Sequence, residues 1–154
     1  MEGLWSFLLP TMRQDDEWIK EDKIGEIYAI RADKFRRKNY PKTKAKSVLL
    51  DYGIYPIAFC LHYLQNAEIK NFTGAYLAKD IDTEWSIVSN ENNKIGIINL
   101  SSRADNSSHA SIIGTKGSVV FDSHFNRTNA VNLYDIAGKL VERKVFKYDS
   151  DGFE

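Results

Sequence analysis

The sequence is poor in several features that would place a chain in a specialised class. It contains a single cysteine, Cys60, so no disulfide can form within the chain, which favours a reducing compartment such as the cytoplasm. Its 21 basic and 21 acidic residues cancel, so no net charge attracts nucleic acid or an anionic membrane. No apolar run approaches the roughly 20 residues of a membrane span, and residues 1–14 do not resemble a signal peptide. We therefore expect a cytoplasmic protein without nucleic-acid or membrane partners.

Two further absences concern cofactors. The sequence has no G-x-G-x-x-G run, which forms the turn that holds the pyrophosphate of a dinucleotide. It also has no clustered metal ligands, because Cys60 and His62 are two positions apart and do not share one helical face. We therefore expect neither a metal site nor a nucleotide-binding turn within these 154 residues.

The order of the expected elements indicates an α+β fold. Helices are expected within 11–25 and 47–64, with a strand over 26–35 between them. The pattern then changes to strands, with Gly114 and Gly117 as turn residues. These strands are expected near 68–79, 83–90, 94–103, 108–121, 129–137 and 140–148. Such an order predicts an antiparallel-rich open β-sheet with helices packed on one face, in a single domain over 1–154.

The segment 36–46, RRKNYPKTKAK, is basic and polar. Two interpretations stay open, a solvated loop and a phosphate-binding patch. Because this segment directly precedes 47–64, we expect it to border any site that the following segment forms.

The segment 47–64, SVLLDYGIYPIAFCLHYL, combines apolar and ionisable residues. At helical spacing one stripe is formed by Asp51, Tyr55, Phe59 and His62, and the other side by Leu50, Ile54, Ile57, Leu61 and Leu64. Pro56 should kink the helix or divide it into two. A carboxylate and a phenol that reach the same volume could hold and protonate a carbonyl-derived oxygen. The alternative stays open that Asp51 caps or bonds local backbone, that Tyr55 is an amphipathic core residue and that His62 is a surface or hydrogen-bonded histidine.

Five stretches, in order, give the chain a family likeness. They are MEGLWSFLLP, IGEIYAIRADKF, the D-x-G-x-Y-P pattern that begins at Asp51, ASIIGTKGSVVFDSHFNR, and the terminal DGFE. Together they resemble the C-terminal domain of the Gfo/Idh/MocA oxidoreductases, nearest in motif to glucose–fructose oxidoreductase and the dihydrodiol dehydrogenases. The resemblance implies a two-domain parent protein whose N-terminal Rossmann domain is absent from this chain.

The resemblance also implies roles for individual residues. Tyr55 would give or take the proton at the substrate hydroxyl or carbonyl, and Asp51 would orient the substrate. Trp5 would wall the pocket, and His62 is a further candidate for substrate binding. The chain departs from the family in KAKSVLLD, where Ala45, Lys46 and Ser47 stand near the positions of a glycine-rich run.

The expected function is therefore that of a substrate-binding and dimerisation domain of an NAD(P)-dependent oxidoreductase acting on a polyol, sugar or diol. NAD or NADP would belong to the full-length protein, and this chain alone is expected to bind no cofactor and to be inactive. A homodimer through the open sheet face is expected. The alternative is a stand-alone ligand-binding or protein-interaction module that has lost redox function.

Overall fold

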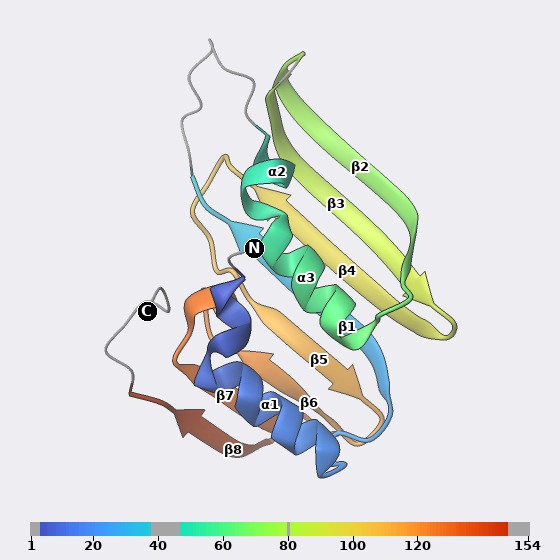
Figure 1. The fold of residues 1–154 in the computed structure, drawn as a ribbon, viewed down its shortest axis with the longest axis vertical. Coiled ribbons are helices and arrows are strands. Elements are labelled where there is room, and N and C mark those ends of the chain that lie inside the picture. The colour runs from blue at the N-terminus through green and yellow to red at the C-terminus, as the bar shows by residue number, and fades with distance from the viewer. Residues whose placement is uncertain (1–3, 38–46, 80, 148–154) are drawn as a thin grey trace.

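The strands form one eight-stranded sheet in the computed structural model, which describes residues 4–37, 47–79 and 81–147 (Figure 1). In chain order they are β1 (Ile27–Phe35), β2 (Glu68–Ala78), β3 (Ile81–Glu91), β4 (Lys94–Ser101), β5 (Ala110–Gly114), β6 (Gly117–Phe121), β7 (Ala130–Asp135) and β8 (Leu140–Val145). Their order across the sheet is β2-β3-β4-β1-β5-β6-β7-β8. Strands β1 and β4 pair in parallel, and the other pairings between these strands are antiparallel.

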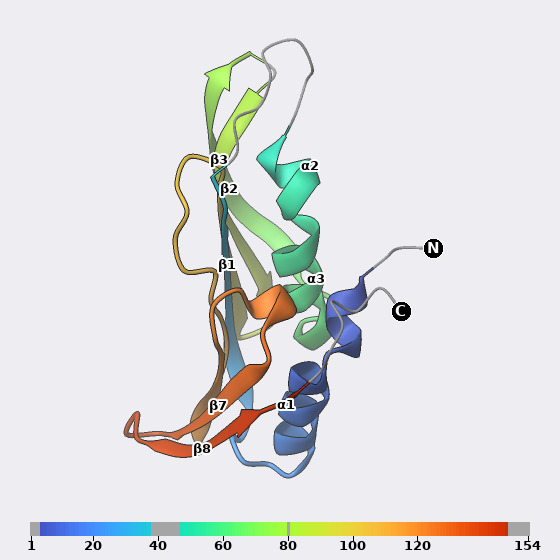
Figure 2. The same ribbon diagram turned by 90° about the vertical axis from the view of Figure 1, so that its left-hand side faces the viewer.

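The helical elements are η1 (Trp5–Leu8), α1 (Pro10–Lys20), α2 (Val48–Tyr52), α3 (Ile54–Tyr63) and the short turn η2 (Phe125–Arg127). Helices α1, α2 and α3 lie on the same face of the sheet, seen edge-on in Figure 2. The predicted α+β class, with a mostly antiparallel open sheet and helices on one face, is confirmed.

The stretch 108–121 forms two strands rather than one continuous strand. The turn between them falls at the expected glycines, and both glycines lie close to neighbouring backbone. A Cβ on Gly114 would lie 2.2 Å from the carbonyl oxygen of Ile24, and one on Gly117 would lie 2.2 Å from that of Tyr134. Side chains at these two positions would therefore push the neighbouring segments apart.

The segment 47–64 folds as two successive helices, as its proline predicts. Ser47 caps α2, because its hydroxyl accepts a hydrogen bond from Leu50 N at 3.1 Å. Helix α2 ends before Gly53, and α3 begins directly after it. Pro56 thus occupies the first turn of α3, where a backbone N–H has no intrahelical acceptor to lose.

The apolar side of this segment is only partly buried, since Leu64 is in the core but other members are exposed. Leu50 is 84% exposed and Leu61 is 44% exposed. The buried side chains on α2 and α3 are instead Val48, Tyr52, Pro56, Phe59 and Cys60. Nearly every residue from Ile54 to Cys60 is apolar, so periodicity alone could not select the face that packs on the sheet.

The core is centred on Phe59 of α3. Its ring lies 5.3 Å from the ring of Phe121 on β6 and 5.4 Å from that of Phe125 in η2. It also lies 5.2 Å from the ring of Tyr63, one turn further along α3. These edge contacts fasten α3 and η2 to the same part of the sheet.

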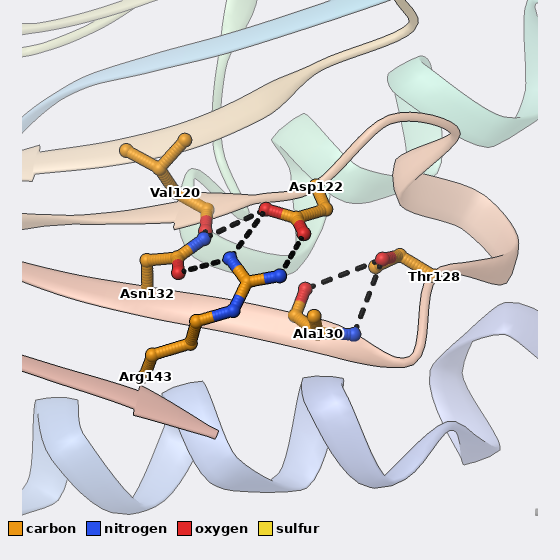
Figure 3. A network of polar contacts seen from close by, with 6 residues as sticks. All are labelled: Val120, Asp122, Thr128, Ala130, Asn132 and Arg143. Atoms are coloured by element: carbon orange, nitrogen blue, oxygen red, sulfur yellow. Dashed lines mark hydrogen bonds and ion pairs between the residues drawn. The ribbon is translucent and has the colours of Figure 1, made fainter. Parts of the chain in front are cut away.

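The last three strands are joined by a polar network on the sheet face opposite the helices (Figure 3). The Arg143 guanidinium donates to the Asp122 carboxylate at 2.6 Å and to the Asn132 side-chain oxygen at 2.7 Å. Asn132 in turn donates to Asp122 at 2.8 Å. The contact with Arg143 contributes to holding the pKa of Asp122 below its usual range. The network thus joins β8 to β7 and to the end of β6 through charged and polar side chains. It lies on the sheet face that carries no helix among the described residues.

Candidate functional site

Tyr55 lies half-buried in the first turn of α3 and packs against the core. The Nζ atom of Lys34 lies 5.8 Å from the centroid of its ring. A phenol and an ammonium therefore occupy the same region of the helix-covered face.

Lys34 is placed there by the alternation of β1. Ile30 and Ala32, at the same parity, are fully buried in the core, and Lys34 itself is only 5% exposed. Its Nζ donates to the Asn126 side-chain oxygen at 2.6 Å. Burial, together with the positive charges of Arg127 and Arg36, lowers the pKa of Lys34 to about 8.

The turn η2 brings Asn126 to this lysine. Phe125 N donates to the carbonyl oxygen of Ser108 at 2.9 Å, and Phe125 packs on the aromatic core. The Ser108 hydroxyl accepts from Phe35 N at 3.0 Å at the end of β1. Two segments far apart in sequence are therefore fastened side by side.

His124 precedes η2 and adds a second nitrogen to the region. Its Nδ1 atom is buried and has no hydrogen-bond partner in the described part of the chain. Burial lowers the pKa of His124, and the charges of Lys34, Arg127 and Arg36 act in the same direction. The surroundings of His124 are therefore positive, with Asp105 as the acid that opposes this effect.

Asp51 is exposed on α2, one helical turn before Tyr55. The cap of α2 is Ser47, supported by the Asp82 carboxylate, which accepts from Leu49 N at 3.1 Å. Asp51 is therefore not the N-cap of α2, and the alternative that it bonds local backbone stays open. Its predicted action together with Tyr55 stays a prediction.

His62 and Trp5 lie near the junction of η1, α1 and α3. The His62 Nε2 atom is 3.2 Å from the Asp16 Oδ1 atom, and its ring centroid is 5.2 Å from that of Phe7. Trp5 is half-buried in η1 and packs against the core. These contacts describe where both residues lie, and their predicted roles in substrate binding stay predictions.

A second buried ionisable group, Asp15, is on the buried side of α1. It is fully buried, and its Oδ2 atom accepts a hydrogen bond from the Tyr63 hydroxyl. Burial raises the pKa of Asp15 well above its usual value. Among the described residues no group of three or more His, Cys, Asp and Glu side chains is placed to hold a metal ion.

Sequence reasoning did not find Lys34, Asn126 or His124. One signal was available for the lysine, because alternation in IYAIRADKF places it on the same face as Ile30 and Ala32. The basic segment 36–46 and the terminal DGFE lie almost entirely outside the described residues, as do Ala45 and Lys46. No helix in the described ranges is both long enough and apolar enough to cross a membrane.

Comparison with known proteins identifies the family. Residues 12–120 match the family model described as the GFO/IDH/MocA C-terminal domain. The chain belongs to the Gfo/Idh/MocA family. The match shows the family but does not select a branch within the family. No curated protein matches the sequence.

Solved structures agree with this fold for the Gfo/Idh/MocA chain. KijD10, a 3-ketoreductase from Actinomadura kijaniata solved with TDP-benzene and NADP, superposes with a TM-score of 0.80 at 19% identity. The match covers 94% of this chain and 46% of that one. An oxidoreductase from Pseudomonas syringae gives a TM-score of 0.71 at 13% identity, covering 92% of this chain and 40% of that one. The chain thus spans somewhat less than half the length of these relatives.

The Gfo/Idh/MocA chain therefore presents a phenol next to an ammonium of lowered pKa on its helix-covered face. A phenol can give or accept one proton. The arrangement can hold a substrate oxygen and move a proton to or from it.

Proposed function

We propose that this chain is the substrate-binding part of an NAD(P)-dependent oxidoreductase acting on a hydroxyl or carbonyl group of a polyol, sugar or diol. NAD or NADP, held by another part of the full-length protein, would supply or accept the hydride. Tyr55 gives or takes the proton at the substrate oxygen. By itself the chain has no dehydrogenase activity.

The observation that carries this proposal is the placement of the Tyr55 phenol beside the buried Lys34 ammonium in a chain of this family. Relatives support it. KijD10, a related 3-ketoreductase, has been solved with NADP, and also as a variant in which a single tyrosine is replaced.

The remaining candidates keep the roles that the family resemblance implies. In this proposal Asp51 orients the substrate from the end of α2, and Trp5 and His62 contact it from η1 and the second half of α3. All of these residues lie on the helix-covered side of the sheet, the side from which a substrate would reach Tyr55.

Replacing Tyr55 tests the assignment. In the full-length gene product, Tyr55→Phe should lower kcat by about 10²–10⁴-fold with little change in KM, because the ring remains and the proton is lost. NADPH oxidation is followed with a panel of sugars, polyols and diols in both directions. Tyr28→Phe is the matched control, since Tyr28 is 45% exposed on β1, and it should retain full activity.

Two results contradict the proposal. Full kcat in Tyr55→Phe would remove this residue from the chemistry. Micromolar binding of NADPH to the 154-residue chain by calorimetry would contradict a substrate domain that depends on another part for its cofactor. A gene product without turnover on any of these substrates would favour the stand-alone binding module.

We further propose that the chain forms a homodimer through the open sheet face. By strand register this face carries the half-buried side chains of Val88, Ile97, Ile113 and Val120, with the exposed Arg31 beside Ile97. Ile97→Asp should convert the dimer to a monomer in light scattering, because a charge would be buried against the partner. Leu50→Asp, on the helix side and 84% exposed, should leave the oligomeric state unchanged. A monomeric wild-type protein would exclude the dimer.

A further inference from the structure

A cavity of about 180 Å³ lies along the flank of α3 that faces β2 and β3 (Figure 1). Its inner wall is formed by Cys60 of α3, by Ile87 and Ser89 of β3 and by Ile98 of β4. These four residues are between 2% and 7% exposed. The cavity therefore reaches the surface of the core.

The outer wall of the cavity is apolar as well. Leu61 of α3 and Ile69 of β2 are 44% and 64% exposed and form its mouth. Ile57 of α3 and Ala67, in the turn between α3 and β2, are half-buried and complete the lining. A molecule that enters here therefore meets apolar side chains from the mouth inward.

Gly96 of β4 leaves room for a hydroxyl and a thiol at the floor. A Cβ at Gly96 would lie 2.4 Å from the Ser89 Oγ atom and 3.3 Å from the Cys60 Sγ atom. The Ser89 hydroxyl donates to the carbonyl oxygen of Gly96 at 3.5 Å, which is longer than an ordinary O–H···O hydrogen bond. Because the chain engages this hydroxyl only weakly, it can pair with one polar atom of a ligand.

The lining defines the chemistry of the molecule that fits. None of the side chains that line the cavity is charged, so nothing in it compensates an ion. An ordered water needs two to four polar partners, which this lining does not offer, so water is held poorly. An apolar cavity of about 150 Å³ is large enough to bind benzene. The volume and the lining therefore favour one small apolar group.

We infer that this cavity binds a small neutral alcohol with an alkyl or aryl body of about six to eight carbon atoms. The body contacts the isoleucine side chains, and the hydroxyl group pairs with that of Ser89. Tyr55 and Ile57 are two positions apart on α3, so their side chains point about 200° apart around the helix axis. The cavity is therefore separate from the proposed catalytic phenol, and the inference does not depend on the proposed function.

Titration of benzyl alcohol into the 154-residue chain, followed by NMR of isoleucine methyl groups, tests the site. The cavity isoleucines are Ile57, Ile69, Ile87 and Ile98. Their methyl resonances should shift and saturate with a Kd of about 1 mM or lower. The resonances of Ile30, buried elsewhere in the core, and of Ile136, 71% exposed, should not shift.

Two variants separate the apolar contact from the hydrogen bond. Ala67→Leu should fill part of the cavity and weaken binding of benzyl alcohol by at least about tenfold. Ala75→Leu is the matched control, because Ala75 is exposed on β2 outside the cavity, and it should change binding by less than about twofold. Ser89→Ala keeps the apolar lining, so it should weaken benzyl alcohol by about tenfold and leave the affinity for toluene unchanged.

Several results would overturn the site. Shifts that do not saturate, or that extend equally to Ile30 and Ile136, would show that benzyl alcohol does not bind in the cavity. Binding by Ala67→Leu as tight as that of the wild type would do the same, and should that variant not fold, equal affinities of Ser89→Ala and the wild type for benzyl alcohol would exclude the hydroxyl contact. Tighter binding of benzoate than of benzyl alcohol would contradict a neutral ligand. Cavity resonances that change with protein concentration alone would assign the cavity to a side chain of a second copy.

Discussion

Lys34 and Asp15 are both buried beneath the helices, but the chain treats their charges differently. The Asp15 carboxyl accepts from the Tyr63 hydroxyl, and burial raises its pKa, so protonation can remove its charge. Lys34 meets only the neutral oxygen of Asn126 among its hydrogen-bond partners in the described residues, and the charges acting on it are positive. Each group thus has one side-chain hydrogen bond and like charges nearby, Asp16 for the acid and Arg127 and Arg36 for the lysine, and burial moves their pKa values in opposite directions.

The two sites are linked through the aromatic core. The Phe59 ring lies 5.2 Å from that of Tyr63, which bonds to Asp15. It lies 5.4 Å from that of Phe125, the residue before Asn126. A substitution at Asp15 or at Lys34 should therefore act on one of the two groups, whereas a substitution of Phe59 should act on both.

Phe59→Ala should break both sites together and have the largest effect. Removing a fully buried aromatic ring should cost about 3–5 kcal/mol in the free energy of unfolding, measured by urea denaturation. Phe72→Ala is the control, because Phe72 is 63% exposed on β2 and should cost less than about 1 kcal/mol. A loss below about 1 kcal/mol in Phe59→Ala would show that this ring does not organise the core.

Lys34→Met should remove a pH dependence of the free energy of unfolding at basic pH. The folded pKa of Lys34 is about 8 and the unfolded value is 10.5, so the unfolded chain binds more protons between them. Stability of the wild type should therefore rise with pH above about 8. Relative to the variant, this gain should reach on the order of 2 kcal/mol by pH 10. Parallel pH profiles for the two proteins would contradict burial of a charged lysine, and Lys116→Met should keep the wild-type profile.

Asp15→Asn should change the pH dependence of the free energy of unfolding at acidic pH. We expect this effect to be the smallest of the three. The folded pKa is raised above the ordinary value of 3.8, so the folded chain binds more protons and loses stability as pH rises through this window. Asparagine cannot ionise, so the stability of the variant relative to the wild type should increase as pH rises from the acidic range. Asp22→Asn, an exposed acid, is the control. A variant that is less stable than the wild type at every pH would show that the carboxyl is needed in its charged form.

Local sequence patterns were sufficient for much of the fold. Alternation and turn residues predicted the strands, and the D-x-G-x-Y-P pattern drew attention to Tyr55, because these signals lie within a few residues of each other. The packing face of α3 was not predictable in this way. Its residues are apolar on nearly all sides, and only contact with β1 and β4 decides which of them are buried.

What the sequence by itself determined is therefore the order of the elements, the α+β class and the position of the phenol on a divided helix. The tertiary structure alone decided what surrounds that phenol. Lys34 and Asn126 are 92 positions apart, and they meet because Ser108 and Phe125 fasten η2 to the end of β1. Burial then lowers the pKa of the lysine to about 8. Both effects depend on long-range packing, which no local pattern of residues encodes.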